Sequence, residues 1–343
     1  MPVFDPTCHT YHHGQFDLAK LVARKQACDQ TVTVIVPARN EAATITAVVE
    51  VLVRLRKQTL VDEVLVVDSY STDETAGRAA AAGARVVAQS RGLWATGQLG
   101  GKGEALWQGL ASSTGTLVVH LDADVEDLDQ HYVTGLLGPL LCHREVALVK
   151  AAYDRPEPDR GVARGRALPG AGGRVTELLA RPLLATFWPE LAWIVQPLAG
   201  EIAGRRHVLE RLRYPSGYGI ELAMLLDIAE GYGAAAIAQV DLGQRSHQPQ
   251  ALPALGIMAT EILHIAIDRL HQQHRDRLPT ELPDELIQPA RSRDGALTWT
   301  TRTVPAGQHP PLVPDPQRPA TRPAAPTVGP APDEGHCSSR MTS

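Results

Sequence analysis

The chain has 343 residues, 44% of them hydrophobic, and a formal net charge of −5 at pH 7. This length suffices for one large hydrophobic core, or for one domain with extensions. The acidic balance gives no electrostatic reason to expect a nucleic-acid partner.

The cysteines and the N-terminal residues indicate a cytoplasmic protein. The four cysteines are far apart and form no CxxC pair, so we expect neither a disulfide framework nor a zinc site, and a reducing compartment fits. The first residues lack the apolar core of a signal peptide. No segment approaches the about 20 apolar residues of a membrane span, so we expect no membrane association.

From about residue 31, β-branched apolar runs alternate with segments of helical spacing. The pattern predicts buried strands at 31–38, 61–69, 84–90 and 116–124. It predicts helices between them at 45–58, 75–83 and 103–113. This order predicts an α/β fold, a doubly wound and mostly parallel sheet with helices on both faces. Ligands bind outside the carboxyl ends of such strands, where this chain places polar clusters.

The second half of the chain is less regular. We expect strands at 146–153 and 234–247, and helices at about 127–141, 175–187, 216–233 and 254–273. Ten of the 26 prolines fall in the last 40 residues, so we expect the chain to be disordered from about residue 303.

Two carboxylates, Asp122 and Asp124, follow the fourth predicted strand with only Ala123 between them. Strand side chains alternate, so both can point the same way, where they repel each other unless a cation lies between them. Hard oxygen ligands suit Mg²⁺ or Mn²⁺ carrying substrate phosphates. An isolated DxD is more often a capping aspartate beside a solvated one. After the fourth strand of a nucleotide-binding half, however, it is where sugar-nucleotide transferases hold the donor diphosphate.

A family resemblance extends over about residues 31–270. The stretch VIVPARNEAATI resembles the opening of GT-A glycosyltransferases, and further blocks are similar, in order, to the glucosyl-3-phosphoglycerate synthase family. These blocks are VDSYSTDET, GKGEALW, HLDAD, GGRVTELLARPLL, QPLAGEIA, GYGIE and AQVDLGQRSH. The resemblance implies a GT-A fold with an acceptor-binding C-terminal half. We therefore expect an N-terminal extension (1–30), a GT-A domain (31–275) with nucleotide-sugar (31–126) and acceptor (127–275) halves, and a C-terminal extension (276–343).

The resemblance implies a metal-dependent retaining glycosyltransferase that moves glucose from UDP-glucose to the 2-hydroxyl of 3-phosphoglycerate. It also implies Mg²⁺ or Mn²⁺ as cofactor and a homodimer. Three alternatives stay open: a mannosyl-3-phosphoglycerate synthase using GDP-mannose, a paralogue with another phosphorylated acceptor, and an inactive sugar-nucleotide-binding protein. A nucleotidyltransferase would have a glycine-rich phosphate loop after the first strand, where this chain has RNEA.

The family's donor and metal residues map onto positions of this chain. The implied donor-binding residues are Pro37, Ala38, Arg39, Glu41, Ser69, Lys102, Asp122 and Ala123. The implied metal ligands are Asp122, Asp124 and His247. Taken alone, a histidine at the end of a strand is more often a hydrogen-bonded structural residue than a ligand. The chain departs from the family pattern at Arg39, Tyr70, Ala123 and Gln248–Pro249.

A glycine-rich stretch beginning at Pro169 leads into a predicted helix and indicates an anion site. Backbone N–H groups at such a helix start, with an arginine capable of bidentate contacts, suit a phosphate. Arg164, Arg166 and Arg181 would add positive charge. From the residues alone, a flexible loop before an ordinary helix start is an equally good interpretation. The family implies acceptor binding by Gly173, Arg174, Val175, Thr176, Tyr218 and Arg245.

The resemblance also implies catalytic roles for Glu221, Asp124 and Lys102. Glu221 could simply complement the dipole of a helix start. No residue has the features of a covalent nucleophile. We therefore expect front-face attack, in which the departing diphosphate accepts the proton and Glu221 orients the acceptor hydroxyl.

Overall fold

The computed structural model describes residues 6–89, 101–154, 173–245, 251–273, 285–292 and 294–303. Eight strands form one sheet, in the order β1 (Thr10–His12), β8 (Ile237–Gln244), β6 (Leu148–Asp154), β7 (Ile202–Arg205), β5 (Leu117–His120), β2 (Val32–Ala38), β3 (Glu63–Asp68) and β4 (Arg85–Ala88). Neighbouring strands are parallel except at β7, which runs antiparallel to β5 and β6. The predicted mostly parallel α/β sheet is confirmed.

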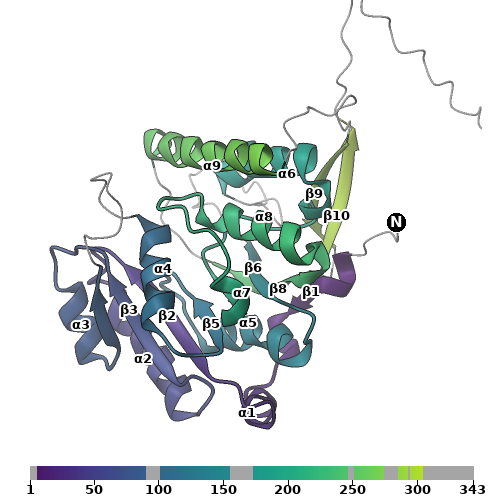
Figure 1. The fold of residues 1–343 in the computed structure, drawn as a ribbon. Helices are drawn as coiled ribbons and strands as arrows, with labels where there is room; N and C mark the ends of the chain where they lie inside the picture. The colour runs from purple at the N-terminus through teal and green to yellow at the C-terminus, as the bar shows by residue number, and fades with distance from the viewer. Residues whose placement is uncertain are drawn as a thin grey trace, which may run out of the picture. The chain divides into compact units, whose positions relative to one another are not determined.

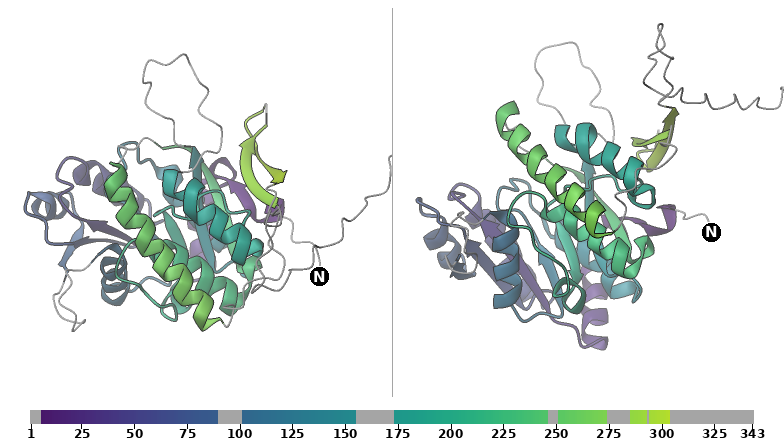
Figure 2. Two further views of the ribbon diagram at one scale, coloured as in Figure 1. Left: turned by 90° about the horizontal axis from the view of Figure 1, so that it is seen from above. Right: turned by 45° about the horizontal axis from the view of Figure 1, so that its top comes forward.

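Helices cover both faces of this sheet (Figure 1). One face packs against α1 (Leu18–Ala27), α2 (Ile45–Lys57), α3 (Thr75–Ala81) and α5 (Gln130–Cys142). The other face packs against α4 (Lys102–Ser112), α6 (Arg181–Phe187), α7 (Arg206–Leu209), α8 (Ile220–Tyr232) and α9 (Leu252–Gln272). Strand β2 shows why both faces are covered, because Val34 and Val36 point into one core and Ile35 into the other. Helices α6 and α9 lie side by side in both views of Figure 2.

Short helical turns complete the described elements. They are η1 (Pro6–His9), η2 (His13–Gln15), the π-helical turn η3 (Thr176–Ala180), η4 (Pro189–Leu191) and η5 (Ala234–Ala236). The helix predicted at 175–187 is therefore η3 followed by α6. The strand predicted to reach 124 ends earlier, at His120. Strand β8 ends at Gln244, and residues 246–247 of the predicted strand lie outside the described residues.

Strand β7 was not predicted, and its direction matters for the site. The parallel strands place their carboxyl ends at one edge of the sheet. Because β7 runs the opposite way, its amino end meets that same edge, with Ile202 opposite both His120 and Lys150. The residues just before it, Gly200 and Glu201, therefore lie among the polar residues that follow β5, β6 and β8.

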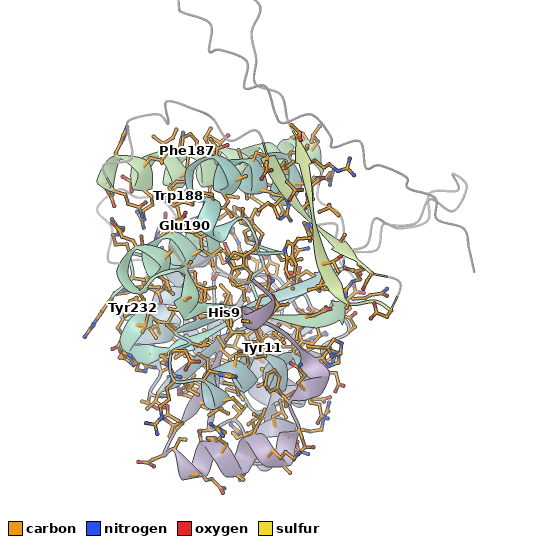
Figure 3. The ribbon with its side chains drawn as sticks, turned by 90° about the vertical axis from the view of Figure 1, so that its right-hand side faces the viewer. His9, Tyr11, Phe187, Trp188, Glu190 and Tyr232 are labelled. Atoms are coloured by element: carbon orange, nitrogen blue, oxygen red, sulfur yellow. The ribbon has the colours of Figure 1, made fainter. Side chains whose placement is uncertain are left out.

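Residues predicted as an N-terminal extension supply the edge strand β1, which pairs with β8 from Thr10↔Gln239 to His12↔Asp241. Figure 3 shows His9 and Tyr11 along this segment. The segment continues over α5, where a Cβ added to Gly138 would lie 2.2 Å from the ring of Phe16. The predicted domain boundaries remain a prediction.

Three histidines gather where this segment meets α5. Ring centroids lie 4.3 Å apart for His12 and His13, and 4.6 Å apart for His13 and His131. Burial, and then the charges of His131 and His12, lower the pKa of His13 below 6.5, although Asp241 opposes this. Below pH 6.5 the unfolded chain therefore binds more protons at this group, and folding stability declines.

We expect His13→Gln to lessen the acid loss of stability. Its Tm should fall less than the wild-type Tm as the pH is lowered from about 7 to about 5, because the variant lacks the proton uptake of the unfolded state. Thermal unfolding followed by circular dichroism would measure this difference. His271→Gln, on the exposed end of α9, serves as the control and should follow the wild type. Equal losses in His13→Gln and the wild type would contradict the assignment.

A hairpin of β9 (Glu285–Arg291) and β10 (Leu297–Thr303) follows α9 in the chain and was not predicted. Its Trp299 donates a hydrogen bond from Nε1 to the carbonyl of Trp193 at 2.8 Å. The proline-rich tail, for which disorder was predicted, lies outside the described residues. Among the described helices, none is long and apolar enough to cross a membrane.

Candidate active site

A cavity of about 560 Å³ opens at the edge of the sheet where the parallel strands end. Every residue predicted to bind the donor, the acceptor or the metal, or to act in catalysis, lines it except His247. His247 lies outside the described residues, as do Arg164 and Arg166, which were predicted to add positive charge. The lining residues are Pro37, Ala38, Arg39, Glu41, Ser69, Gly101, Lys102, Asp122, Ala123, Asp124, Gly173, Arg174, Val175, Thr176, Leu198, Gly200, Gly217, Tyr218, Glu221, Arg245, Leu255, Met258 and Glu261.

The turns after β2 and β3 form one side of the cavity and hold each other. Asn40 donates its backbone N–H to Ser71 Oγ at 3.0 Å, and its side-chain oxygen accepts from the N–H of Thr72 at 2.8 Å. Asn40 and Tyr70 have φ values of 58° and 59°, in the left-handed region that favours glycine. Tyr70 is one of the positions where the chain departs from the pattern of the family that it resembles, and its backbone is one that glycine would adopt more readily.

Lys102, at the first position of α4, joins two carboxylates from different parts of the chain. Its Nζ lies 2.7 Å from Asp122 Oδ1 and 2.8 Å from Glu221 Oε1. Burial alone would lower the pKa of Lys102, but Asp122 and Glu221 outweigh it and raise the pKa above its ordinary value. The ammonium group therefore stays charged and links the turn after β5 to the start of α8.

The glycines on either side of Lys102 allow this arrangement. The turn that carries Lys102 lies backbone to backbone against the turn before α8, where Gly103 donates to the carbonyl of Ser216 at 3.0 Å. A Cβ on Gly103 would lie 1.8 Å from the carbonyl oxygen of Pro215. A Cβ on Gly101 would lie 2.4 Å from that of Ser216. No side chain fits at either position without separating the two turns.

Gly200, at the amino end of β7, packs against the same ion pair. A Cβ at this position would lie 2.4 Å from both carboxylate oxygens of Asp122 and 2.4 Å from Lys102 Nζ. The fully buried Lys150 fixes the backbone next to Gly200, because its ammonium group donates a hydrogen bond to the carbonyl of Ala199. Burial lowers the pKa of Lys150 to about 8.

We expect Gly200→Ala to lower kcat/KM by about tenfold or more, equivalent to ~1.4 kcal/mol of lost transition-state stabilisation. The added methyl group would separate Lys102 from Asp122 and displace both from the cavity. Steady-state kinetics would test this, with Gly231→Ala as the control, because a Cβ at Gly231 would meet nothing within 4 Å. Wild-type turnover by Gly200→Ala would show that this ion-pair geometry is not needed.

Arg245, directly after β8, is nearly buried and surrounded by acceptors. Its Nη1 lies 2.6 Å from Glu201 Oε1 and 3.0 Å from the hydroxyl of Tyr153. Its Nη2 lies 2.9 Å from Asp124 Oδ1 and 3.6 Å from Asp122 Oδ2. Burial opposes the charge of Arg245, but Glu201, Tyr153 and the two aspartates raise its pKa well above the ordinary value. The guanidinium is therefore fixed beside both aspartates of the DxD sequence.

The turn that begins at Gly173 also lines the cavity. The carbonyl of Gly173 accepts the N–H of Glu177 at 3.0 Å, as in the first turn of a helix, and Thr176 is 3% exposed. Arg174 lines the cavity at this turn. The sequence also assigned Arg181 to the positive field, which is wrong: its guanidinium is buried and donates to Glu177 and to the carbonyl of Val195.

Comparison with known proteins identifies the family. The family model described as glycosyl transferase family 2 matches residues 33–210. The chain is 40% identical over 311 residues to glucosyl-3-phosphoglycerate synthase from Petrotoga mobilis, covering 90% of this chain and 94% of that protein. The chain belongs to the glucosyl-3-phosphoglycerate synthase family. It is a glycosyltransferase, as the sequence predicted.

Two further proteins are similar to this member of the glucosyl-3-phosphoglycerate synthase family. The Mycobacterium tuberculosis enzyme (strain H37Rv) is 42% identical over 264 residues, 77% of this chain and 80% of that protein. Its crystal structure with Mn²⁺, UDP-glucose and phosphoglyceric acid has a TM-score of 0.68 and 37% identity, and covers 88% of this chain and 97% of that chain. Mannosyl-3-phosphoglycerate synthase from Rubrobacter xylanophilus has a TM-score of 0.72 and 35% identity, over 87% of this chain and 95% of that chain.

Sequence reasoning missed several residues of the site. Glu201, the fully buried partner of Arg245, belongs to the quoted block QPLAGEIA but received no role. Helix α9 was predicted without a part in the site, yet Leu255, Met258 and Glu261 line the cavity. Glu261 accepts the backbone N–H of Tyr218 at 2.7 Å, which fixes the turn before α8. The glutamate in the QPLAGEIA block was the available signal for Glu201, whereas α9 gave only an amphipathic pattern.

Proposed function

We propose that this chain transfers glucose from UDP-glucose to the 2-hydroxyl of 3-phosphoglycerate, with retention of configuration and with a divalent metal ion. The observation that carries the proposal is a single cavity that brings the turns after β2 and β3, the DxD sequence and the Gly173–Thr176 turn together. The activity named for relatives of 40% and 42% identity supports it.

The donor is assigned to the side formed by Pro37, Ala38, Arg39, Glu41 and Ser69. Pro37 and Ala38 end β2, and the other three residues follow β2 or β3, at the edge where nucleotides bind in open parallel sheets. Lys102, Asp122 and Ala123 lie next to them and would contact the sugar and diphosphate. The charge of Lys102, whose side chain is only 21% exposed, stabilises a developing phosphate charge more than it would in water.

The residues present fit a divalent cation. Asp122 and Asp124 supply hard carboxylate oxygens two residues apart, and the Asp124 side chain is 56% exposed. The family resemblance assigns the third ligand to His247, which lies outside the described residues. Among the described residues, no group of three His, Cys, Asp or Glu side chains could hold an ion. Mg²⁺ or Mn²⁺, present in solved relatives with UDP, would supply positive charge for the leaving diphosphate.

The acceptor is assigned to the turn that begins at Gly173, with Arg174, Val175, Thr176, Tyr218 and Arg245. Backbone N–H groups at a helix start and an arginine suit the phosphate and carboxylate of 3-phosphoglycerate. Tyr218 lies near the start of α8, close in sequence to Glu221. Glu221 is 3% exposed and its Oε1 lies 2.8 Å from Lys102 Nζ. A carboxylate fixed in this way can orient the acceptor hydroxyl, and the departing diphosphate would take its proton.

A matrix of donors and acceptors tests the proposal. Purified protein with Mg²⁺ should be most active with UDP-glucose and 3-phosphoglycerate. Preference for GDP-mannose would favour the mannosyl alternative, for which the likeness to the Rubrobacter xylanophilus structure is the specific observation. Preference for another phosphorylated acceptor would indicate a paralogue. Binding of the donor without turnover of any pair would indicate an inactive sugar-nucleotide-binding protein.

We also infer a cytoplasmic homodimer. Among the described residues, no two cysteines are joined by a disulfide, which fits a reducing compartment. Helix α9 exposes apolar side chains, with Leu252 70% and Ile257 64% exposed, and Leu178 beside it is 79% exposed. A second copy covering this face would remove these side chains from water. Light scattering that gives a monomer mass at micromolar concentration would contradict the dimer.

A further inference from the structure

Arg291, the last residue of β9, joins two neighbouring strands of the central sheet. Its Nε donates to Asp154 Oδ2 at 2.7 Å. Its Nη1 and Nη2 donate to the two carboxylate oxygens of Asp241 at 2.6 and 3.0 Å, a bidentate contact. Asp154 ends β6 and Asp241 lies in β8, so one guanidinium holds two neighbouring strands.

These contacts lead directly to the active site. The backbone carbonyl of Asp154 accepts the N–H of Arg245 at 2.9 Å. The pairing of β6 and β8 is irregular between Ala152 and Asp154, so regular strand pairing does not fix this position. Arg245 then holds Asp124 with its side chain. A change at Arg291 therefore reaches the cavity through Asp154 and then Arg245.

The carboxylates need a cation at this place. Asp241 is 5% exposed, and its other described side-chain contact is the N–H of Gly243 at 2.9 Å. Asp154 and Asp241 extend from adjacent strands and repel each other in surroundings of low dielectric constant. Arg291 offsets both charges, and it fixes its own hairpin through a bond from Nη1 to the carbonyl of Gly295 at 2.8 Å.

We propose that Arg291 is a positioning residue for the transferase reaction: by holding Asp154 and Asp241 it sets the place of Arg245, which the proposed function assigns to the acceptor. The β9–β10 hairpin, outside the region matched by the family model, is then part of what shapes the acceptor side of the cavity. The inference rests on the proposed function, because the expected change is in the KM of the acceptor that the proposed function names.

Steady-state kinetics on the full chain test this with Arg291→Gln, which removes the charge and keeps much of the length. The acceptor KM should rise about tenfold, equivalent to ~1.4 kcal/mol, while the donor KM stays within about twofold. Arg302→Gln is the matched control, since Arg302 lies in the same hairpin with an exposed side chain. Its kinetic constants should equal those of the wild type.

A double-mutant cycle with Asp154→Asn measures the coupling between the two residues, which general destabilisation would not change. Asp154→Asn should also raise the acceptor KM. The effects of the two substitutions should be less than additive in the double mutant, because each removes the same Arg291–Asp154 contact. Should Arg291→Gln fail to fold, Asp154→Asn alone is read by the same criteria. An unchanged acceptor KM, or equal rises in both KM values, would overturn the proposal. The wild type is assayed first, so absence of its turnover counts against the proposed function instead.

Discussion

Asp124→Asn should lower turnover by about two to three orders of magnitude. The amide has the shape of the carboxylate and can still accept a hydrogen bond from Arg245, whose Nη2 lies 2.9 Å from Asp124 Oδ1. What it loses is the negative charge that a divalent cation requires. Melting temperature should change little, because the side chain is 56% exposed.

Two measurements separate this effect from general damage. Calorimetric titration with UDP and Mn²⁺ should show weaker binding by Asp124→Asn, while Glu126→Gln, an exposed neighbour outside the cavity lining, should bind like the wild type. EDTA should silence the wild-type enzyme, and added Mg²⁺ or Mn²⁺ should restore it. Full activity in EDTA would remove the metal from the reaction.

Arg174→Ala should raise the KM for 3-phosphoglycerate by roughly 30- to 1,000-fold, since a charge-assisted phosphate contact in a closed site is worth about 2–4 kcal/mol. Arg174 lines the cavity beside the backbone of the Gly173–Thr176 turn. The donor KM should change little, because the nucleotide is assigned to other residues of the lining, among them Pro37 and Ser69.

Glycerate provides the control for Arg174→Ala. Without its phosphate it should be a poor acceptor for the wild type, and the substitution should weaken it much less than it weakens 3-phosphoglycerate. A misfolded turn would harm both acceptors alike. If the 3-phosphoglycerate KM is intact, or if glycerate suffers equally, the phosphate does not bind at this turn.

The parts of the site that follow parallel strands could be predicted from the sequence, because each short apolar run ends in a polar cluster at a known edge. Asp122 and Asp124 are the clearest case. The parts that depend on distant pairs could not. Glu201 resembles an ordinary residue before a four-residue strand, and its partner Arg245 lies 44 positions later in the chain.

Hydrophobic periodicity also fails to predict β7 and the C-terminal hairpin, because both depend on contacts with distant parts of the chain. The sequence IAGR is too short and too polar to show strand periodicity, and it forms β7 because β5 and β6 lie on either side of it. Arg291 reads as one more charge in a polar C-terminal segment. Its function depends on Asp154 and Asp241, which no local pattern connects to it.

The backbone contact between the Lys102 turn and the turn before α8 restricts how members of this family can be recombined. Gly103 and Pro215 are so close that each turn is shaped to the other, although more than a hundred residues separate them in the chain. A chimaera that takes residues 101–103 from one relative and 215–217 from another would combine surfaces that did not evolve together. Exchange of donor preference by grafting therefore requires both segments to be transferred as one unit.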